Sequence, residues 1–313
     1  MLTGIFSPLP TPFGAEGALA LDLLQSNVIK LNATGLSGYL ALGSNSEAVH
    51  VTPDESSQVF KAVCQSAAPD KFVFGGTGQF ATQATIEMTR CAADAGCKAA
   101  LVLTPFYYKG SMTGAVLRKH FETVADQSPI PIMIYNVPAN TGINLGPSIV
   151  AEIARHPNVI GIKDSAGDVN QLAETVRATR GKPPSRNIHA STASTASRSP
   201  GFDVISGHFG SMLPSLTFGV AGGILAVANV APNECVEIFN LYQQGKVAEA
   251  GELHLRILPL ARAVTSQYGV PGLKAAMDRL GYFGGAPRPP LQPLGIEQRA
   301  DLEKILREAG MIN

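Results

Sequence analysis

Val159-Ile-Gly-Ile-Lys163 is a short, continuously apolar run that ends in a charged residue and is followed at once by Asp164 and Ser165. Most other apolar runs in the chain are also unbroken, with no alternation of apolar and polar residues, which is typical of parallel strands covered on both faces. We expect eight strands, at 4–6, 38–42, 72–76, 99–103, 131–135, 159–163, 203–206 and 222–226.

Helical segments separate these runs. The clearest begins at Pro53, where Thr52 and Glu55 supply the two partners of a capping box and the proline occupies the first turn. We expect helices at 53–67, 81–95, 112–126, 146–155 and 169–180. Strands that alternate with helices predict an α/β protein with a (β/α)8 TIM barrel. A doubly wound open sheet is the alternative, but Gly75-Gly-Thr-Gly78 lacks the G-x-G-x-x-G spacing of a dinucleotide-binding fold.

The pattern changes after the last apolar run. Only helical segments follow, at 232–245, 247–267, 272–280 and 297–308, so we expect a barrel over residues 1–231 and a C-terminal helical region over 232–313. Residues 181–201 are rich in Ser, Thr, Ala and Pro without periodicity. They predict a low-complexity loop on the barrel's N-terminal face, away from the chemistry.

The composition excludes several classes of partner. The 313-residue chain has 24 basic and 24 acidic residues and no Trp, so we expect it to bind neither nucleic acid nor a membrane surface. A small neutral or anionic metabolite fits better. The four cysteines show no C-x-x-C spacing, which favours reduced thiols. The first strand leaves no room for a signal or transit peptide, and the apolar stretch 217–231 is shorter than the roughly 18 residues of a membrane span, so we expect a soluble cytoplasmic protein.

Reactive side chains gather where the expected strands end, and these C-terminal ends carry the chemistry of a TIM barrel. They are the segments 43–45, 104–107, 135–136 and 163–165, together with Gly207. Lys163 closes an apolar strand, where a charged ammonium is costly, so we expect its amine to be driven toward the neutral, nucleophilic form. A neutral lysine adds to a ketone to give a Schiff base, which withdraws electrons without a metal or cofactor. A lysine that merely reaches solvent is the alternative.

Two further groups fit this chemistry. Tyr135 ends the neighbouring strand, and a phenol beside an imine can carry the proton of a substrate alcohol. The turn Gly43-Ser44-Asn45 offers N–H groups and a hydroxyl to a carboxylate. A buried structural tyrosine and an ordinary turn are the alternatives for each alone, but the set is more specific than its parts.

These segments resemble the dihydrodipicolinate synthase and N-acetylneuraminate lyase family of Schiff-base aldolases over nearly the whole chain. Residues 43–47, GSNSE, are similar to the family's G-[ST]-x-G-E carboxylate-binding turn. Residues 135–142, YNVPANTG, are similar to its Y-N-x-P-x-x-T-G segment, and residues 161–165, GIKDS, to its G-x-K-[DE]-[ST] lysine motif. The C-terminal segments 271–277 and 288–291 also fit.

The resemblance implies a role for each matching residue. Lys163 would form the Schiff base, Tyr135 would be the acid and base, and Ser44 with Tyr107 would complete the proton relay. Ser44 and Asn45 would hold the carboxylate of the 2-oxo acid. The resemblance also implies a homotetramer built as a pair of dimers. In it, an adjacent subunit supplies the relay tyrosine, which is either Tyr107 or Tyr108.

The other half of the substrate is expected to meet Asn140, Ser165 and Gly207, with His208 nearby. Dihydrodipicolinate synthases carry an arginine in the Y-N-x-P-x-R-T-G pattern, where this chain has Asn140, and this argues against the lysine-biosynthetic reaction. A second departure is Ser46, which replaces the glycine of the carboxylate-binding turn.

Residues 104–110 and 138–142 look closest to the 4-hydroxy-2-oxoglutarate aldolase branch. We therefore expect a carbon–carbon lyase that cleaves 4-hydroxy-2-oxoglutarate to pyruvate and glyoxylate. The first alternative is a 2-keto-3-deoxy sugar acid aldolase of sugar acid catabolism, which would give pyruvate and glyceraldehyde from L-threo-3-deoxy-hexulosonate. Less favoured alternatives are a 4-hydroxy-tetrahydrodipicolinate synthase, a dehydratase and a non-catalytic 2-oxo acid sensor.

Overall fold

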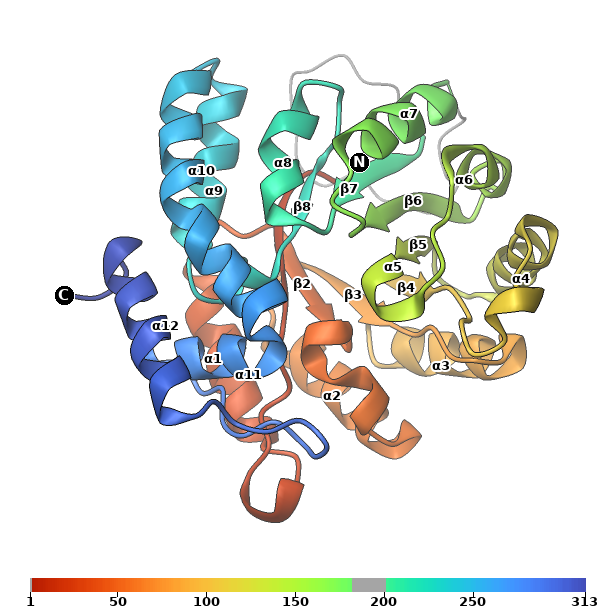
Figure 1. Ribbon diagram of the computed structural model, residues 1–313. Coiled ribbons are helices and arrows are strands. Elements are labelled where there is room, and N and C mark those ends of the chain that lie inside the picture. Colours follow the sequence, from red (N-terminus) through yellow and green to blue (C-terminus); the bar gives the residue numbers. More distant parts are fainter. Residues whose placement is uncertain (1, 182–200) are drawn as a thin grey trace. The chain divides into compact units, whose positions relative to one another are not determined.

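A computed structural model describes residues 2–181 and 201–313, so the expected loop at 181–201 falls almost wholly outside the described residues. Eight strands close into a barrel in chain order, which confirms the (β/α)8 TIM barrel (Figure 1). The strands are β1 (Gly4–Pro8), β2 (Gly38–Ala41), β3 (Phe72–Gly76), β4 (Ala99–Leu103), β5 (Ile132–Asn136), β6 (Val159–Asp164), β7 (Asp203–Ser206) and β8 (Gly222–Ile224).

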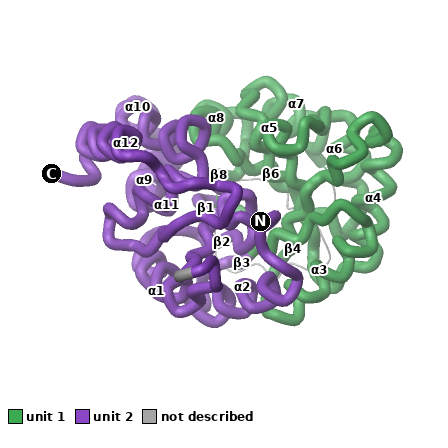
Figure 2. Tube along the Cα trace, turned by 60° about the horizontal axis from the view of Figure 1, so that its bottom comes forward, with its two compact units in different colours: residues 1–3, 74–223 green, residues 4–73, 224–313 purple. Residues whose placement is uncertain are grey.

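The chain forms two compact units, one of residues 1–3 and 74–223 and one of residues 4–73 and 224–313 (Figure 2). The helices of the first unit are α3 (Thr82–Asp94), α4 (Gly114–Gln127), α5 (Pro138–Thr141), α6 (Pro147–Ile153), α7 (Val169–Thr179) and α8 (Phe209–Leu216). Those of the second are α1 (Leu21–Asn32), α2 (Pro53–Ser66), α9 (Pro232–Gln243), α10 (Val247–Arg262), α11 (Gly269–Arg279) and α12 (Ile296–Glu308).

In the first unit, alternate strand residues face the helices. Ile134 and Ile162 are fully buried in a core that also holds Phe121 of α4, Val150 of α6 and Leu172 of α7. Because successive side chains of a strand point to opposite faces, the residues on either side of these isoleucines face the inside of the barrel. The register places Leu103, Tyr135, Lys163 and Ile205 at one level across β4 to β7.

In the second unit, β1 and β2 pair in parallel, and helices α9 to α12 follow β8 in the chain. The expected cap of α2 is confirmed, because Glu55 N donates to Thr52 Oγ1 at 3.2 Å and Thr52 N donates to Glu55 Oε2 at 2.8 Å. The C-terminal helical extension is confirmed, while a domain boundary at residue 232 stays a prediction.

Three helices were not expected from the sequence. Helix α1 has no side-chain cap at Ala20, α5 is a single short turn, and α8 contains Pro214. Each lacks the start signal or the length on which a sequence-based assignment depends.

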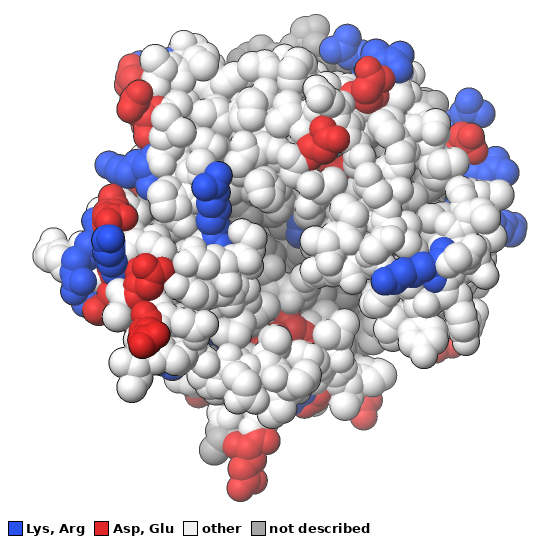
Figure 3. Space-filling model, in the orientation of Figure 1, with Lys and Arg blue, Asp and Glu red and all other residues white. Residues whose placement is uncertain are grey.

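No described helix has the length and apolar character needed to cross a membrane. On the face drawn in Figure 3, acidic and basic side chains of the described residues are interspersed instead of gathered by sign.

Candidate active site

Lys163 and Tyr135 face each other across two adjacent strands. They are paired in the register of β5 and β6, and only 4% of Lys163 and 6% of Tyr135 is exposed. The Lys163 Nζ atom lies 4.2 Å from the centroid of the Tyr135 ring. Among the described residues, no carboxylate forms an ion pair with this amine. The structure thus places the predicted nucleophile beside the predicted acid–base residue.

The next residue of β6, Asp164, points to the other side of the strand and anchors the loop that follows. Its carboxylate accepts hydrogen bonds from Ala166 N at 2.8 Å and from Gln171 Nε2 of α7 at 2.7 Å. Burial raises the pKa of Asp164, and these hydrogen bonds partly offset that effect. Asp164 therefore fixes the end of the strand that carries Lys163.

Asn136 plays the matching part after Tyr135. Its Oδ1 accepts from Leu145 N at 3.0 Å, and its Nδ2 donates to Asn144 Oδ1 at 2.8 Å. Asn144 in turn exchanges hydrogen bonds of 2.8 and 3.0 Å with Gln171. A chain of polar side chains thus joins the ends of β5 and β6. Asn144 and Gln171 were not expected from the sequence, since both lie several residues beyond the strand ends.

The structure brings Ser165 and Gly207 to Lys163. Ser165 N donates to Asn136 O at 2.8 Å and Gly207 N donates to Asp164 O at 2.6 Å, so both backbones continue the strand ladder. A Cβ atom added to Gly207 would lie 2.9 Å from Lys163 Cε and 1.9 Å from Ser165 Oγ. Glycine at this position therefore leaves the space that the lysine side chain occupies.

The other expected residues of this unit lie on exposed segments. Asn140 and His208 are exposed, the former on α5 and the latter just after Gly207. Tyr107 and Tyr108 are each 72% exposed and pack edge to face, with ring centroids 5.1 Å apart. Phe80 lies 6.1 Å from the Tyr107 ring, so these rings form an exposed aromatic cluster.

The expected carboxylate-binding turn lies in the other unit. Ser44–Ser46 form one turn of 3₁₀ helix in which Ser44 and Asn45 remain partly exposed. Ser46, which replaces a family glycine, is buried and adds hydrogen bonds: its hydroxyl donates to Leu9 O, and its carbonyl accepts from Thr11 Oγ1 at 2.7 Å. The substitution thus fastens the turn to the segment after β1.

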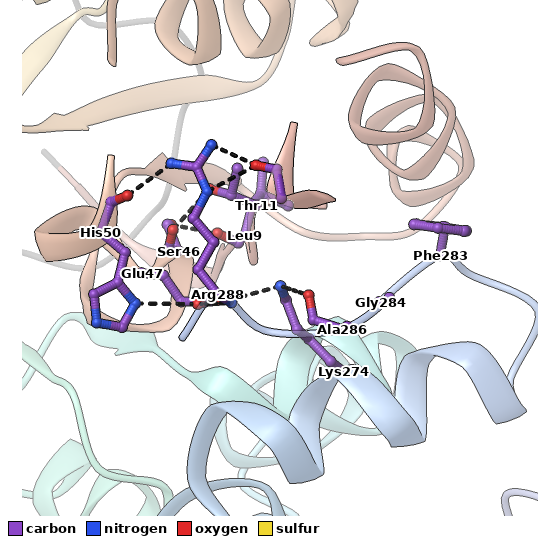
Figure 4. Close-up of polar contacts among 12 residues, drawn as sticks. Leu9, Thr11, Ser46, Glu47, His50, Lys274, Phe283, Gly284, Ala286 and Arg288 are labelled. Carbon is purple, nitrogen blue, oxygen red and sulfur yellow. Dashed lines mark hydrogen bonds and ion pairs between the residues drawn. The ribbon is translucent and has the colours of Figure 1, made fainter. Parts of the chain in front are cut away.

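Buried charges follow this turn (Figure 4). Glu47 Oε1 lies 2.6 Å from Lys274 Nζ of α11, and Glu47 Oε2 accepts from Arg288 N at 2.8 Å. Burial lowers the pKa of Lys274, and the hydrogen bond with Glu47 partly offsets that effect. In the sequence these residues appear only within three family-like segments, with no signal that they touch.

The histidines do not form a metal centre in the described part of the chain, which holds no cluster of three or more His, Cys, Asp or Glu side chains suited to a metal ion.

Comparisons with known proteins agree on one family. The model of the dihydrodipicolinate synthetase family matches residues 1–309. The 4-hydroxy-tetrahydrodipicolinate synthase of Methanothrix thermoacetophila is 36% identical over 98% of this chain and 96% of its own length. The dihydrodipicolinate synthase of Acinetobacter baumannii, solved with pyruvate, is 27% identical over the full length of both chains, with a TM-score of 0.89. A prophage protein of this family from E. coli K12, also solved with pyruvate, is 28% identical over both full lengths, with a TM-score of 0.89.

Proposed function

This chain belongs to the dihydrodipicolinate synthetase family of Schiff-base pyruvate aldolases, and we propose that it cleaves 4-hydroxy-2-oxoglutarate to pyruvate and glyoxylate. The observation that carries the proposal is the buried Lys163 amine, 4.2 Å from the centroid of the Tyr135 ring. It supplies a nucleophile and an acid–base group side by side, as imine chemistry at a ketone requires.

In the proposed reaction, the Lys163 amine adds to the C2 ketone and water leaves as the C=N bond forms, which gives a protonated imine. Tyr135 removes the proton of the C4 hydroxyl, the C3–C4 bond breaks, and its electron pair moves into the iminium to form an enamine. The C4 carbon leaves as the aldehyde. Protonation of the enamine at C3 and hydrolysis of the imine then release pyruvate and the free amine.

The pyruvate half is proposed to lie with its carboxylate on the turn of Ser44 and Asn45, whose partly exposed side chains and backbone N–H groups suit an anion. The Ser44 hydroxyl and Tyr107 would pass the proton between Tyr135 and solvent. Ser165 and Gly207 would border the carbons next to the imine, because their atoms already border the Lys163 side chain.

The part of the substrate that leaves as the aldehyde is proposed to contact Asn140. Asn140 offers a neutral amide at the position where dihydrodipicolinate synthases carry an arginine for a second carboxylate. The amide can hydrogen-bond to a carboxylate or to hydroxyls. The same feature supports the first alternative, cleavage of L-threo-3-deoxy-hexulosonate to pyruvate and glyceraldehyde. A second candidate, 4-hydroxy-tetrahydrodipicolinate synthase, is favoured by the names of relatives that are 36% identical.

We further propose that the active form is a homotetramer built as a pair of dimers. The exposed cluster of Phe80, Tyr107 and Tyr108 is the support, since aromatic rings left in water mark contact surfaces. Tyr107, which is 72% exposed, is proposed to complete the site of a neighbouring copy.

A panel of substrates tests the proposal. The enzyme is incubated with 4-hydroxy-2-oxoglutarate, with stereoisomeric 3-deoxy-hexulosonates, and with pyruvate plus aspartate semialdehyde, and products are identified by mass. Pyruvate and glyoxylate from the first substrate support the proposal. Turnover only with aspartate semialdehyde would replace it with the synthase. Borohydride trapping of pyruvate on Lys163 without any turnover would indicate a 2-oxo acid sensor.

A further inference from the structure

We infer that the buried ion pair of Glu47 and Lys274 holds the 43–46 turn in its binding conformation, which makes both residues positioning residues for the substrate carboxylate. The identity of the ligand rests on the proposed function, whereas the positioning itself does not. Helix α11 and the segment up to Arg288 would then help to position the carboxylate-binding turn.

The backbone on both sides of the 43–46 turn has an unfavourable conformation. Leu42 before it and Glu47 after it have φ angles of +58° and +56°, in the left-handed region that side-chain-bearing residues rarely adopt. Such residues persist when the surrounding structure over-determines them, and they cluster at ligand-binding sites. Local hydrogen bonds alone are modest: Ser46 N donates to Gly43 O at 3.0 Å and Glu47 N donates to Ser44 O at 3.2 Å. Further fixation comes from a bond of 2.7 Å from His50 N to Glu47 O and from two side chains, that of Ser46 toward the segment after β1 and that of Glu47 at the end of the turn.

The Glu47 carboxylate supplies it with contacts on both oxygens. Oε1 lies 2.6 Å from Lys274 Nζ, while Oε2 accepts from Arg288 N at 2.8 Å and lies 3.2 Å from His50 Nδ1. Glu47 is 2% exposed and Lys274 is fully buried. Because Glu47 is the residue that closes the turn, these contacts fix its backbone as well as its side chain.

The partners of Glu47 are themselves fixed. Lys274 Nζ donates to Ala286 O at 3.1 Å and lies 4.5 Å from the centroid of the Phe13 ring. The Arg288 guanidinium donates to Gly17 O at 2.6 and 2.9 Å, to His50 O at 2.7 Å and to the Glu55 carboxylate at 2.5 and 2.8 Å. In Figure 4, Glu47 lies among Lys274, His50 and the backbone of Arg288, while the Arg288 guanidinium points away toward other partners. The turn is thereby tied to residues of α11 and of the segment after it.

Positioning explains the pair better than stability does. Taking two charges out of water is expensive, and apolar side chains of similar volume often stabilise a buried site as well or better. What apolar packing cannot supply is a directed contact that specifies one backbone conformation. The turn needs that specification, because it carries strained residues on both sides.

The double variant Glu47→Gln with Lys274→Met separates the two roles, since it removes both charges and nearly preserves both shapes. Pyruvate is titrated against borohydride trapping on Lys163, and thermal unfolding is measured in parallel. We expect an unfolding temperature near that of the wild type, with half-saturating pyruvate raised tenfold or more and the maximal labelled fraction unchanged. The matched control is Arg279→Gln, because Arg279 lies on α11 like Lys274 but forms an exposed ion pair, with Glu303 of α12. It should alter neither the unfolding temperature nor the half-saturating pyruvate concentration. Unchanged half-saturation in the double variant would overturn the inference.

A second measurement needs no ligand. Amide hydrogen exchange of peptides covering residues 43–50 should be faster in the double variant than in the wild type, while peptides of β5 and β6 keep their protection. If the wild type traps no pyruvate at all, the proposed function fails, and this exchange experiment alone decides the inference: faster exchange supports it and equal exchange overturns it. If the double variant does not fold, Glu47→Gln alone is measured in the same ways and judged by the same outcomes.

Discussion

The amine of Lys163 lies 4.2 Å from the centroid of the Tyr135 ring, and the two residues are register partners on adjacent parallel strands. The distance is fixed by the strand ladder and not by flexible loops. This placement on neighbouring strands supports the proposed roles of Lys163 as nucleophile and Tyr135 as acid and base.

Replacing Lys163 by Ala should abolish borohydride trapping of pyruvate and lower turnover by at least about a thousandfold, because no other group forms the imine. Mass spectrometry of the trapped protein measures the label, and a coupled assay measures pyruvate release. Lys246→Ala, at an exposed lysine between α9 and α10, is the control and should behave as wild type. Turnover that survives in the Lys163 variant contradicts the mechanism.

Replacing Tyr135 by Phe keeps the ring beside the amine and removes only the hydroxyl. We expect a fall in kcat of roughly 10² to 10⁴-fold, the usual contribution of a general acid or base, while pyruvate still becomes trapped on Lys163. Steady-state kinetics and trapping are compared on one preparation. A loss of trapping equal to the loss of kcat would show that the hydroxyl serves imine formation and not bond cleavage.

Replacing Gly207 by Ala should slow trapping, because the added methyl would meet Lys163 Cε at 2.9 Å and Ser165 Oγ at 1.9 Å. Some displacement of both side chains is required. Gly251→Ala on α10 is the control, since a Cβ there meets nothing within 4 Å, and it should leave trapping intact and stabilise the helix by about 0.5–1 kcal/mol. Equal trapping rates in both variants would show that Gly207 does not shape the site.

The ion pair of Glu55 with Arg288 predicts how stability depends on pH. The hydrogen bond from Arg288 lowers the pKa of Glu55 from 4.5 to about 2. Because the folded-state pKa is depressed, the contribution is complete above pH 4.5 and is lost as the pH falls toward 2. Glu55→Gln should cost on the order of 2 kcal/mol at neutral pH, and the difference from wild type should shrink as the pH falls.

Urea unfolding of wild type and Glu55→Gln at a series of pH values measures this dependence. Glu237→Gln, at an exposed position of α9, is the matched control and should give a much smaller difference. A difference between wild type and the Glu55 variant that is independent of pH would contradict the assignment.

The proposed relay across subunits predicts complementation. Chains with Tyr107→Phe and chains with Lys163→Ala should each be nearly inactive, and mixed oligomers should regain activity. Each mixed oligomer would contain sites with an intact lysine and a tyrosine from the other chain. Sedimentation checks that both variants assemble. Inactive mixtures of properly assembled chains would place the relay tyrosine within its own subunit, or remove it from the mechanism.

Much of the fold was readable from the sequence because its signals are local. Short apolar runs, most of them unbroken, marked all eight strands, and the Thr52–Glu55 capping box marked the start of α2, since each depends on residues adjacent in the chain. The placement of Lys163 and Tyr135 at strand ends followed from the same runs. Helices α1, α5 and α8 escaped prediction because tertiary packing holds them where their own caps and lengths do not.

The sequence by itself thus determined the barrel, the family and the residue types at the strand ends. Only the tertiary structure decided that Lys163 faces the Tyr135 ring, that Gly207 leaves room for the lysine, and that Glu47 meets Lys274. These relationships depend on strand register and on packing between segments far apart in the chain. Such contacts have no local sequence signature, because one buried glutamate or lysine looks like any other until the fold supplies its partner.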